Sequence, residues 1–174
     1  DGNVKSERTN VGDAIIFGLE SFIFCDISKL INLGKFQINS YINSSIINSS
    51  YIRSKENGIT GNNVEFVPKY NTKVGLSLAY QKLVCQIHFS HVAKQYTDAT
   101  NAYDNDLGGI IGLIPSYNIL DISSNYSFKR YKIEFGVNNI LNKKYFTRRA
   151  TGYPGPGIIP DPVINGYVTF EIKI

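Results

Sequence analysis

The sequence predicts an all-β protein whose antiparallel strands cross a membrane as part of a transmembrane β-barrel. Three observations lead to this prediction. Apolar and polar residues alternate at every second position, the alternating segments are long, and tight turns alternate with long connections. The longest strictly apolar runs reach only five or six residues, as in 14–19. A membrane-spanning helix needs about 20 such residues, so the sequence excludes helical spans.

The strands follow from the alternation, taken in order along the chain. The first strand is the least regular, because Ile15 and Phe17 share one face while Phe22 and Phe24 fall on the other. The last strand is the most regular, with an apolar residue at every second position of 168–174. The seven predicted strands cover residues 13–27, 35–50, 65–80, 83–96, 116–128, 131–141 and 166–174.

The connections between these strands differ in length in a regular order. The tight turns are 81–82 and 129–130, the intermediate connection is 28–34, and the long connections are 51–64, 97–115 and 142–165. Alternation of tight turns with long loops makes neighbouring strands antiparallel and places the long loops on one side of the sheet. Barrels of outer membranes share this arrangement of short turns on one side and long loops on the other.

Strand length and residue type point to a membrane rather than to water. Several predicted strands have 13 to 16 residues, whereas globular strands most often have about five or six. One face of each strand is apolar and almost free of charge, and the other is rich in Asn, Ser, Gln, Gly and Lys. A soluble all-β binding module, the alternative, has shorter strands and does not need loops sorted by length. In lipid every strand edge must be paired, so we expect further strands before this chain.

Composition narrows the class of protein further. Of the 174 residues, 43% are hydrophobic and 18% are charged, which excludes a disordered chain. The chain contains no Met, even at position 1, so we expect a fragment or a processed chain. Two Cys residues exclude a disulfide scaffold, and no zinc-ligand spacing is present. The net charge is +4, the basic residues are scattered along the chain, and no motif indicates a nucleic-acid partner.

The segment 135–149, FGVNNILNKKYFTRR, resembles the penultimate strand and loop of TonB-dependent outer-membrane receptors. The following residues 150–160, ATGYPGPGIIP, resemble the ferric-citrate, or iron-chelate, branch of that family. Shorter stretches at 9–13, 18–20, 67–71 and 95–98 are similar to other strands of the family and occur in the same order. Together these stretches extend the resemblance over nearly the whole chain.

The resemblance implies a 22-stranded barrel in a bacterial outer membrane, with residues 1–174 as its last seven strands. It also implies an N-terminal plug domain and a TonB-coupling segment, neither of which we expect within residues 1–174. It also implies a transporter and no enzyme. A receptor of this kind is expected to bind an extracellular ferric chelate, such as ferric citrate or a siderophore, and to import it into the periplasm with energy supplied through TonB. The implied partners are the TonB complex, the barrel-assembly machinery, membrane lipid and lipopolysaccharide. The ferric chelate is cargo, and no cofactor is implied.

Two alternatives stay open at this point. One is a passive, porin-like or structural barrel without a plug, and the other is a receptor for a non-iron substrate such as haem or a glycan. The C-terminal strand also departs from the family. Family members usually end in an aromatic residue recognised during barrel assembly, whereas this chain ends in Ile174. The residues that we expect to serve assembly are Tyr167, Phe170, Ile172 and Ile174.

The candidate substrate-binding residues lie in the last long loop and in the fourth strand. Arg148 and Arg149 are adjacent guanidiniums that suit a polycarboxylate chelate, because each can bind a carboxylate through two hydrogen bonds. Solvated cations or contacts to lipopolysaccharide phosphates are the alternative. Tyr153 precedes a Pro- and Gly-rich stretch, 154–157, which predicts an irregular loop over the barrel mouth. An interfacial aromatic residue is the simpler interpretation of Tyr153.

Histidines, cysteines and acidic residues give weaker signals. His88 and His91 are three positions apart on a strand, so they point to opposite faces and cannot share a metal ion. We expect His88 on the polar face, where it lines the lumen or touches substrate. Cys25 and Cys85 fall on the apolar face, three strands apart, and are predicted to be free thiols. Residues 104–109 fit turn chemistry better than a calcium loop, and no catalytic constellation is present.

Overall fold

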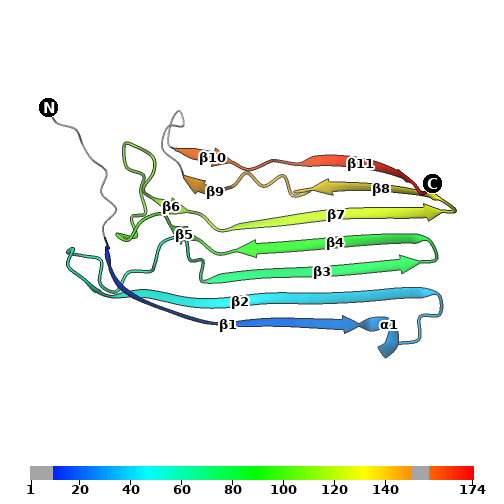
Figure 1. Cartoon of the computed structure of the whole chain (residues 1–174), viewed down its shortest axis with the longest axis horizontal. Helices are drawn as coiled ribbons and strands as arrows, with labels where there is room; N and C mark the ends of the chain where they lie inside the picture. Colours follow the sequence, from blue (N-terminus) through cyan, green and yellow to red (C-terminus); the bar gives the residue numbers. More distant parts are fainter. Residues whose placement is uncertain (1–9, 150–156) are drawn as a thin grey trace.

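A computed structural model describes residues 10–149 and 157–174 of the chain. Its main feature is a seven-stranded sheet in which each strand pairs with its neighbours along the chain, always antiparallel (Figure 1). The strands are β1 (Gly12–Asp26), β2 (Phe36–Ser54), β3 (Tyr70–Tyr80), β4 (Leu83–Val92), β7 (Tyr117–Phe128), β8 (Tyr131–Asn138) and β11 (Asn165–Ile172). The all-β, antiparallel prediction is therefore confirmed.

The two ends of the sheet differ, as the connection lengths predict. At one end, two-residue turns join β3 to β4 and β7 to β8, and Gln81 and Lys129 take positive φ angles of 52° and 51°. Tight hairpin turns of this length need such backbone angles because they match the twist of the strands. The short helix α1 (Ile27–Leu30) and the C-terminus lie at the same end, called here the turn end (Figure 1). The opposite end, with the long connections, is called the loop end.

Several predicted strand boundaries are wrong at the loop end. β2 runs four residues further than predicted, to Ser54, and stays paired with β1 up to Gly12. β3 begins at Tyr70 rather than at residue 65, because Phe66 takes a positive φ of 57° and Pro68 cannot donate a ladder hydrogen bond.

Two other strands end earlier than the alternation suggests. β4 ends at Val92, and the next pairing residues, β5 (Gln95–Tyr96), join β6 (Leu113–Ile114) in a separate two-stranded sheet. β8 ends at Asn138 because the following Asn139 adopts a left-handed φ of 50°. A second small sheet pairs β9 (Phe146–Arg149) with β10 (Ile158–Pro160).

The strand register sorts the side chains onto two faces. One row across the sheet joins Ile42, Val74, Phe89 and Leu120, and the adjacent row joins Tyr41, Gly75, His88 and Asp121. The rows in step with the first form the apolar face, and the rows in step with the second form the polar face. Side chains of the apolar face are open to the surroundings, with Leu19 70% and Phe170 58% exposed. The two-faced pattern predicted from the sequence is therefore confirmed.

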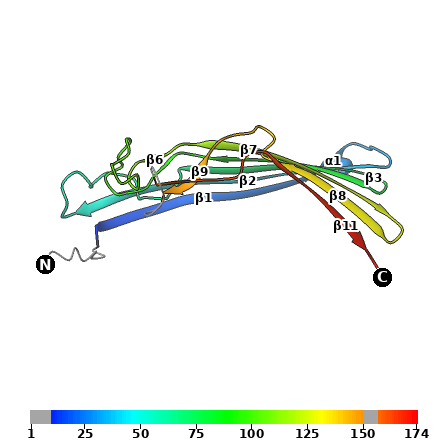
Figure 2. The same ribbon diagram turned by 90° about the horizontal axis from the view of Figure 1, so that it is seen from above.

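The sheet is curved and twisted rather than flat. Seen from above, β8 and β11 bend away from the line of the other strands (Figure 2). Right-handed strand twist produces such curvature, and closing a barrel requires it. β1 and β11 are the two edge strands of the described sheet. Among residues 10–149 and 157–174, the structure contains no helix that is long and apolar enough to cross a membrane.

The buried core lies at the loop end. Tyr51, Ile59 and Ala99 form one buried cluster, and Val11 and Val64 pack against it. The fully buried Ile114 lies in the small sheet that residues 97–115 help to build. The long connections therefore pack against one another at the loop end and bury a small hydrophobic core.

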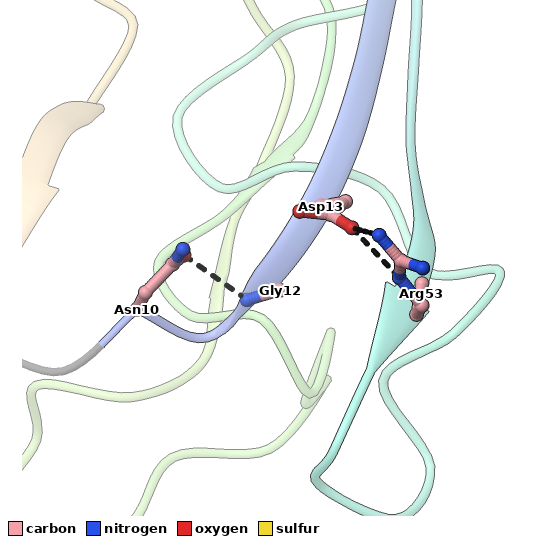
Figure 3. Close-up of polar contacts among 4 residues, drawn as sticks. All are labelled: Asn10, Gly12, Asp13 and Arg53. Carbon is pink, nitrogen blue, oxygen red and sulfur yellow. Dashed lines mark hydrogen bonds and ion pairs between the residues drawn. The ribbon is translucent and has the colours of Figure 1, made fainter.

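An ion pair fastens the two longest strands where they rise beyond their neighbours. The guanidinium of Arg53 at the end of β2 donates from Nε to Oδ2 of Asp13 at 2.8 Å, and its Nη2 reaches the same oxygen (Figure 3). The side-chain oxygen of Asn10 accepts a hydrogen bond from the Gly12 backbone N–H at 3.3 Å (Figure 3). These contacts hold the start of β1 against the end of β2 at the loop end.

Candidate functional site

The two adjacent arginines lie at the loop end in different surroundings. Arg149 pairs with Ile158 across the β9–β10 sheet, and its side chain is half-buried. Its guanidinium donates to the carbonyl oxygens of Gly109 and Leu113, both at 3.2 Å, and lies 5.0 Å from the ring centre of Phe146. Arg149 therefore joins the last long loop to the 97–115 loop. Burial lowers the pKa of the Arg149 guanidinium from its usual value.

Arg148 is the exposed member of the pair. Because successive side chains on a strand point to opposite faces, Arg148 points away from the contacts that hold Arg149. It is thus the guanidinium of the two that is open to a ligand at the loop end. Tyr153, the other predicted residue of this loop, lies outside the described residues.

Aromatic rings brace the same loop against the sheet. The rings of Tyr117, the first residue of β7, and Tyr145 lie 4.6 Å apart between centres. Burial raises the pKa of the Tyr145 hydroxyl, and the carboxylates of Asp161 and Asp121 raise it further. A tyrosine hydroxyl is protonated at neutral pH, and these surroundings favour the protonated form further. The Tyr145 ring holds the start of the last loop over the polar side of the sheet.

Asn139 holds the last long loop in place through hydrogen bonds. It is 2% exposed, and its Nδ2 donates to the carbonyl oxygens of Lys143 at 2.8 Å and Pro162 at 3.2 Å. Its Oδ1 accepts from the Lys143 backbone N–H at 2.9 Å, and its own N–H donates to Asp121 Oδ1 at 2.7 Å. Asn tolerates the left-handed backbone better than most residues. The segment 135–149 that carries the family resemblance therefore builds a loop anchor.

His88 lies on the polar face, as predicted, and contacts a tyrosine two strands away. The Tyr41 hydroxyl and His88 Nδ1 are 3.1 Å apart, and the two ring centres are 6.1 Å apart. Gly75, on the strand between them, makes this contact possible. A Cβ atom at Gly75 would lie 2.1 Å from the Tyr41 ring. The ring of Phe22 packs on the other side of Tyr41, with 6.0 Å between centres.

A second tyrosine crosses a glycine on the same face. Tyr167 on β11 lies over Gly136, where a Cβ atom would come within 2.5 Å of its ring. Its hydroxyl donates to Glu134 Oε1 at 3.1 Å, and the other oxygen of Glu134 accepts from Lys132 at 3.2 Å. Tyr167, predicted to serve barrel assembly, thus packs toward the polar side. Phe170 and Ile172 lie on the apolar face of β11, and Ile174 follows the strand.

A pocket of about 240 Å³ opens where β2, β3 and β4 reach the loop end. Its lining includes the ammonium-bearing side chains of Lys69 and Lys94, together with Asn63 and Tyr96. The sequence does not single out these residues, because each lysine stands alone in it and only the fold brings them to one pocket. Two cations beside amide and hydroxyl groups suit an anionic ligand. Their position at the loop end makes this pocket a second candidate site.

In the part of the chain that the structure describes, the second histidine, the two cysteines and the acidic loop residues form no metal-binding site with one another. His91 points to the apolar face, where its Nδ1 lies 2.6 Å from Asn118 Oδ1, so the two histidines do not converge. Cys25 and Cys85 are free thiols, as predicted. Asp106 accepts hydrogen bonds from the backbone N–H groups of Ile110 and Ile111, which is turn chemistry. Within the described residues, no group of three or more metal-binding side chains comes together.

Comparison with known families assigns this chain. The family of TonB dependent receptor-like β-barrels matches residues 1–140. The chain belongs to the TonB-dependent receptor family. Members of this family are outer-membrane β-barrel proteins, and they are transporters rather than enzymes. The membrane prediction and the family resemblance are thereby confirmed. Comparison with curated protein sequences finds no match.

Solved structures show the same fold. The unliganded ferric citrate transporter FecA superposes with a TM-score of 0.80 at 22% identity, over 91% of this chain and 24% of its own. The ferric yersiniabactin uptake receptor FyuA from Yersinia pestis gives 0.65 at 20% identity, over 94% and 24%. The copper transporter OprC gives 0.68 at 17% identity, over 95% and 24%. The chain therefore spans about a quarter of the length of these structures.

Proposed function

We propose that the chain forms the C-terminal wall, with its loops, of an outer-membrane receptor that imports a ferric chelate with energy supplied through TonB. The observation that carries the proposal is the family match over residues 1–140. The open edges of β1 and β11 fit this role, because both need partner strands in lipid. The further strands of a 22-stranded barrel and an N-terminal plug complete the receptor.

We propose ferric citrate as the cargo. The chemistry of the loop end supports this choice, because ferric citrate is an anionic polycarboxylate and the exposed Arg148 presents five N–H donors to it. The cations of Lys69 and Lys94 lie in a pocket of the same end and add attraction for an anion. FecA, whose fold this chain shares, is a ferric citrate transporter. Siderophores, haem, copper and glycans are the competing cargoes.

The experiment is uptake of radioactive iron citrate by cells with and without the gene, each with and without a protonophore. Energised import predicts gene-dependent uptake that the protonophore abolishes. A passive, porin-like barrel predicts gene-dependent uptake that the protonophore leaves unchanged. Uptake that does not depend on the gene overturns ferric citrate as cargo. The same cells are then supplied with siderophores, haem, copper and glycans in turn.

A variant pair locates the ligand contact in the protein expressed from its complete gene. Arg148→Ala is expected to weaken ferric citrate binding about tenfold or more, since a hydrogen bond to a charged group contributes about 1.5–3 kcal/mol. Lys55→Ala removes another exposed cation of the loop end and is the matched control. Equal affinities of the two variants would remove Arg148 from the binding site. Measured binding of purified protein, rather than uptake, separates this result from any loss of transport.

A further inference from the structure

Three cations gather on two aromatic rings at the turn end, far from the candidate substrate site. The ammonium groups of Lys82 and Lys129 lie 5.1 and 5.5 Å from the ring centre of Phe128. The guanidinium of Arg130 lies 5.6 Å from the ring centre of Tyr131, the direct partner of Phe128 across β7 and β8. All three cations come from the two hairpin turns, 81–82 and 129–130.

A backbone contact holds the two turns side by side. The Ser127 N–H donates to the Lys82 carbonyl oxygen at 3.0 Å, which extends the ladder between β4 and β7 into the turn. Like charges on one ring repel each other, and in the described part of the chain no ion pair joins any of the three to a carboxylate. Such a cluster attracts an anion, because a single negative group lowers the energy of all three cations at once.

An apolar hollow adjoins the cations on the apolar face. It has a volume of about 380 Å³ and is lined by Tyr126, Phe128, Tyr131, Ile133 and Phe170. The rings of Tyr131 and Phe170 stack across it with 5.9 Å between centres. Every lining residue is exposed to the surroundings, between 36% and 58%. The hollow therefore opens toward lipid, directly beside the charged turn end.

We propose that this turn-end site binds an anionic glycerophospholipid of the membrane leaflet at the turn end. The phosphate lies among Lys82, Lys129 and Arg130, and an acyl chain fills the hollow. Aromatic residues of membrane barrels gather at the depth of the headgroups, where such a phosphate resides. Basic residues near a membrane surface attract anionic lipid at about 1 kcal/mol each. The proposal rests on the membrane-spanning sheet and holds whichever cargo the receptor carries.

The test uses protein expressed from its complete gene and purified in a neutral detergent. Dioleoylphosphatidylglycerol and dioleoylphosphatidylcholine are titrated separately, and native mass spectrometry counts the lipids that stay bound after mild activation. The wild type is expected to bind the anionic lipid at least about tenfold more tightly than the zwitterionic one. The variant Lys82→Gln/Lys129→Gln/Arg130→Gln is expected to retain one anionic lipid fewer and to lose this preference.

A matched variant, Lys55→Gln/Lys143→Gln/Lys144→Gln, removes three exposed cations at the loop end. It is expected to keep the preference of the wild type. Equal retention of the anionic lipid by the two triple variants overturns the proposal, as does a wild type that binds both lipids alike. Binding of isolated peptidoglycan in place of the lipid overturns it as well. The single variant Lys129→Gln, checked for folding by its heat-sensitive gel mobility, keeps the test valid if the triple variant misfolds.

Discussion

The loop end and the membrane-crossing part of the sheet use apolar residues in opposite ways. In the described chain, the buried hydrophobic residues are Tyr51, Ile59, Ala99, Leu113 and Ile114, all at the loop end. The much larger apolar face of the sheet is open, with Ile133 45% and Val168 77% exposed. The loop end faces water and must bury its apolar groups against one another. The sheet faces lipid, which takes the place of a protein core.

This difference means that the two regions fail independently. A defect in the loop core opens connections but leaves the strand ladder paired, because local units unfold separately from the whole. A charge on the apolar face leaves the loops packed but destabilises the sheet, because the charge must lie in lipid. The four predictions that follow use protein expressed from its complete gene and run from the largest expected effect to the smallest.

The largest effect is expected from truncation of the fully buried Ile114. Ile114→Ala should destabilise the loop core by about 2–5 kcal/mol, because it removes buried methylenes and leaves a cavity. The measurement is the rate of protease nicking within 97–115 in the detergent-solubilised receptor. Ile133→Ala, the same change on the apolar face, should leave that rate unchanged. Faster nicking with Ile133→Ala would show that the two regions are coupled.

A charge at the middle of the apolar face is expected to destabilise the sheet by nearly as much as Ile114→Ala destabilises the loop core. Ile87 pairs with Leu76 and Ile122 near the centre of the sheet, and Lys at such a depth costs about 2–4 kcal/mol. Ile87→Lys should therefore lower the urea midpoint of unfolding in phospholipid vesicles. Gln86→Lys places the same charge one residue away on the polar face and should have little effect. Equal losses would contradict the assignment of the two faces.

Removal of the Asn139 side chain is expected to have a smaller effect, confined to the last long loop. Asn139→Ala breaks three side-chain hydrogen bonds and should cost about 1–3 kcal/mol, because it leaves buried groups unpaired. Limited proteolysis within 142–165 measures this loss. Asn142→Ala is the control, since Asn142 shares the positive φ of 49° but makes an exposed contact of 3.4 Å. Similar nicking of both variants would mean that Asn139 acts only through its backbone.

The smallest expected effect is a loss of loop stability in alkali. The Tyr51 hydroxyl lies beyond the membrane-crossing part of β2 and donates to Glu65 Oε2 at 2.6 Å. Burial, and then Glu65, raise its pKa to about 12. The protonated hydroxyl therefore contributes fully to loop stability below pH 10, the usual pKa of tyrosine. This contribution is lost as the pH rises toward 12. Each unit of pKa difference corresponds to about 1.4 kcal/mol.

An alkali-stable protease can follow this loss between pH 9 and about pH 12. Nicking of the 51–64 loop should increase over that range in the wild type. In Tyr51→Phe, which has no ionisable hydroxyl, nicking should start higher and change less with pH. A wild-type rate that stays constant up to the highest pH would show that the hydroxyl does not hold this loop.

The sheet could be predicted from the sequence because its order is local. Alternation at every second residue gives the two faces directly, and it placed His88 and His91 on opposite sides. It also placed Cys25 and Cys85 on the apolar face. Tight turns at 81–82 and 129–130 gave the antiparallel order. The irregular first strand follows its sequence pattern as well, since Phe22 and Phe24 lie on the polar face beside Tyr41.

The loop end could not be predicted in the same way. Its partners are distant in sequence, as when Arg149 donates to Gly109 and Leu113, and no periodicity reports such contacts. Arg148 and Arg149 look equivalent in the sequence, although only Arg148 is left exposed. The early end of β8 is a backbone effect at Asn139, which a pattern of side-chain hydropathy does not contain.

The turns at 81–82 and 129–130 also affect the order in which the strands of the sheet pair during folding. Hairpins closed by two residues, β3–β4 and β7–β8, bring their partners together at small entropic cost and form within microseconds in general. The pairings β2–β3, β4–β7 and β8–β11 must instead wait for long loops to close. We expect the wall to assemble from preformed hairpins joined edge to edge. A glycine or proline misplaced in either turn would then slow insertion far more than it would weaken the finished sheet.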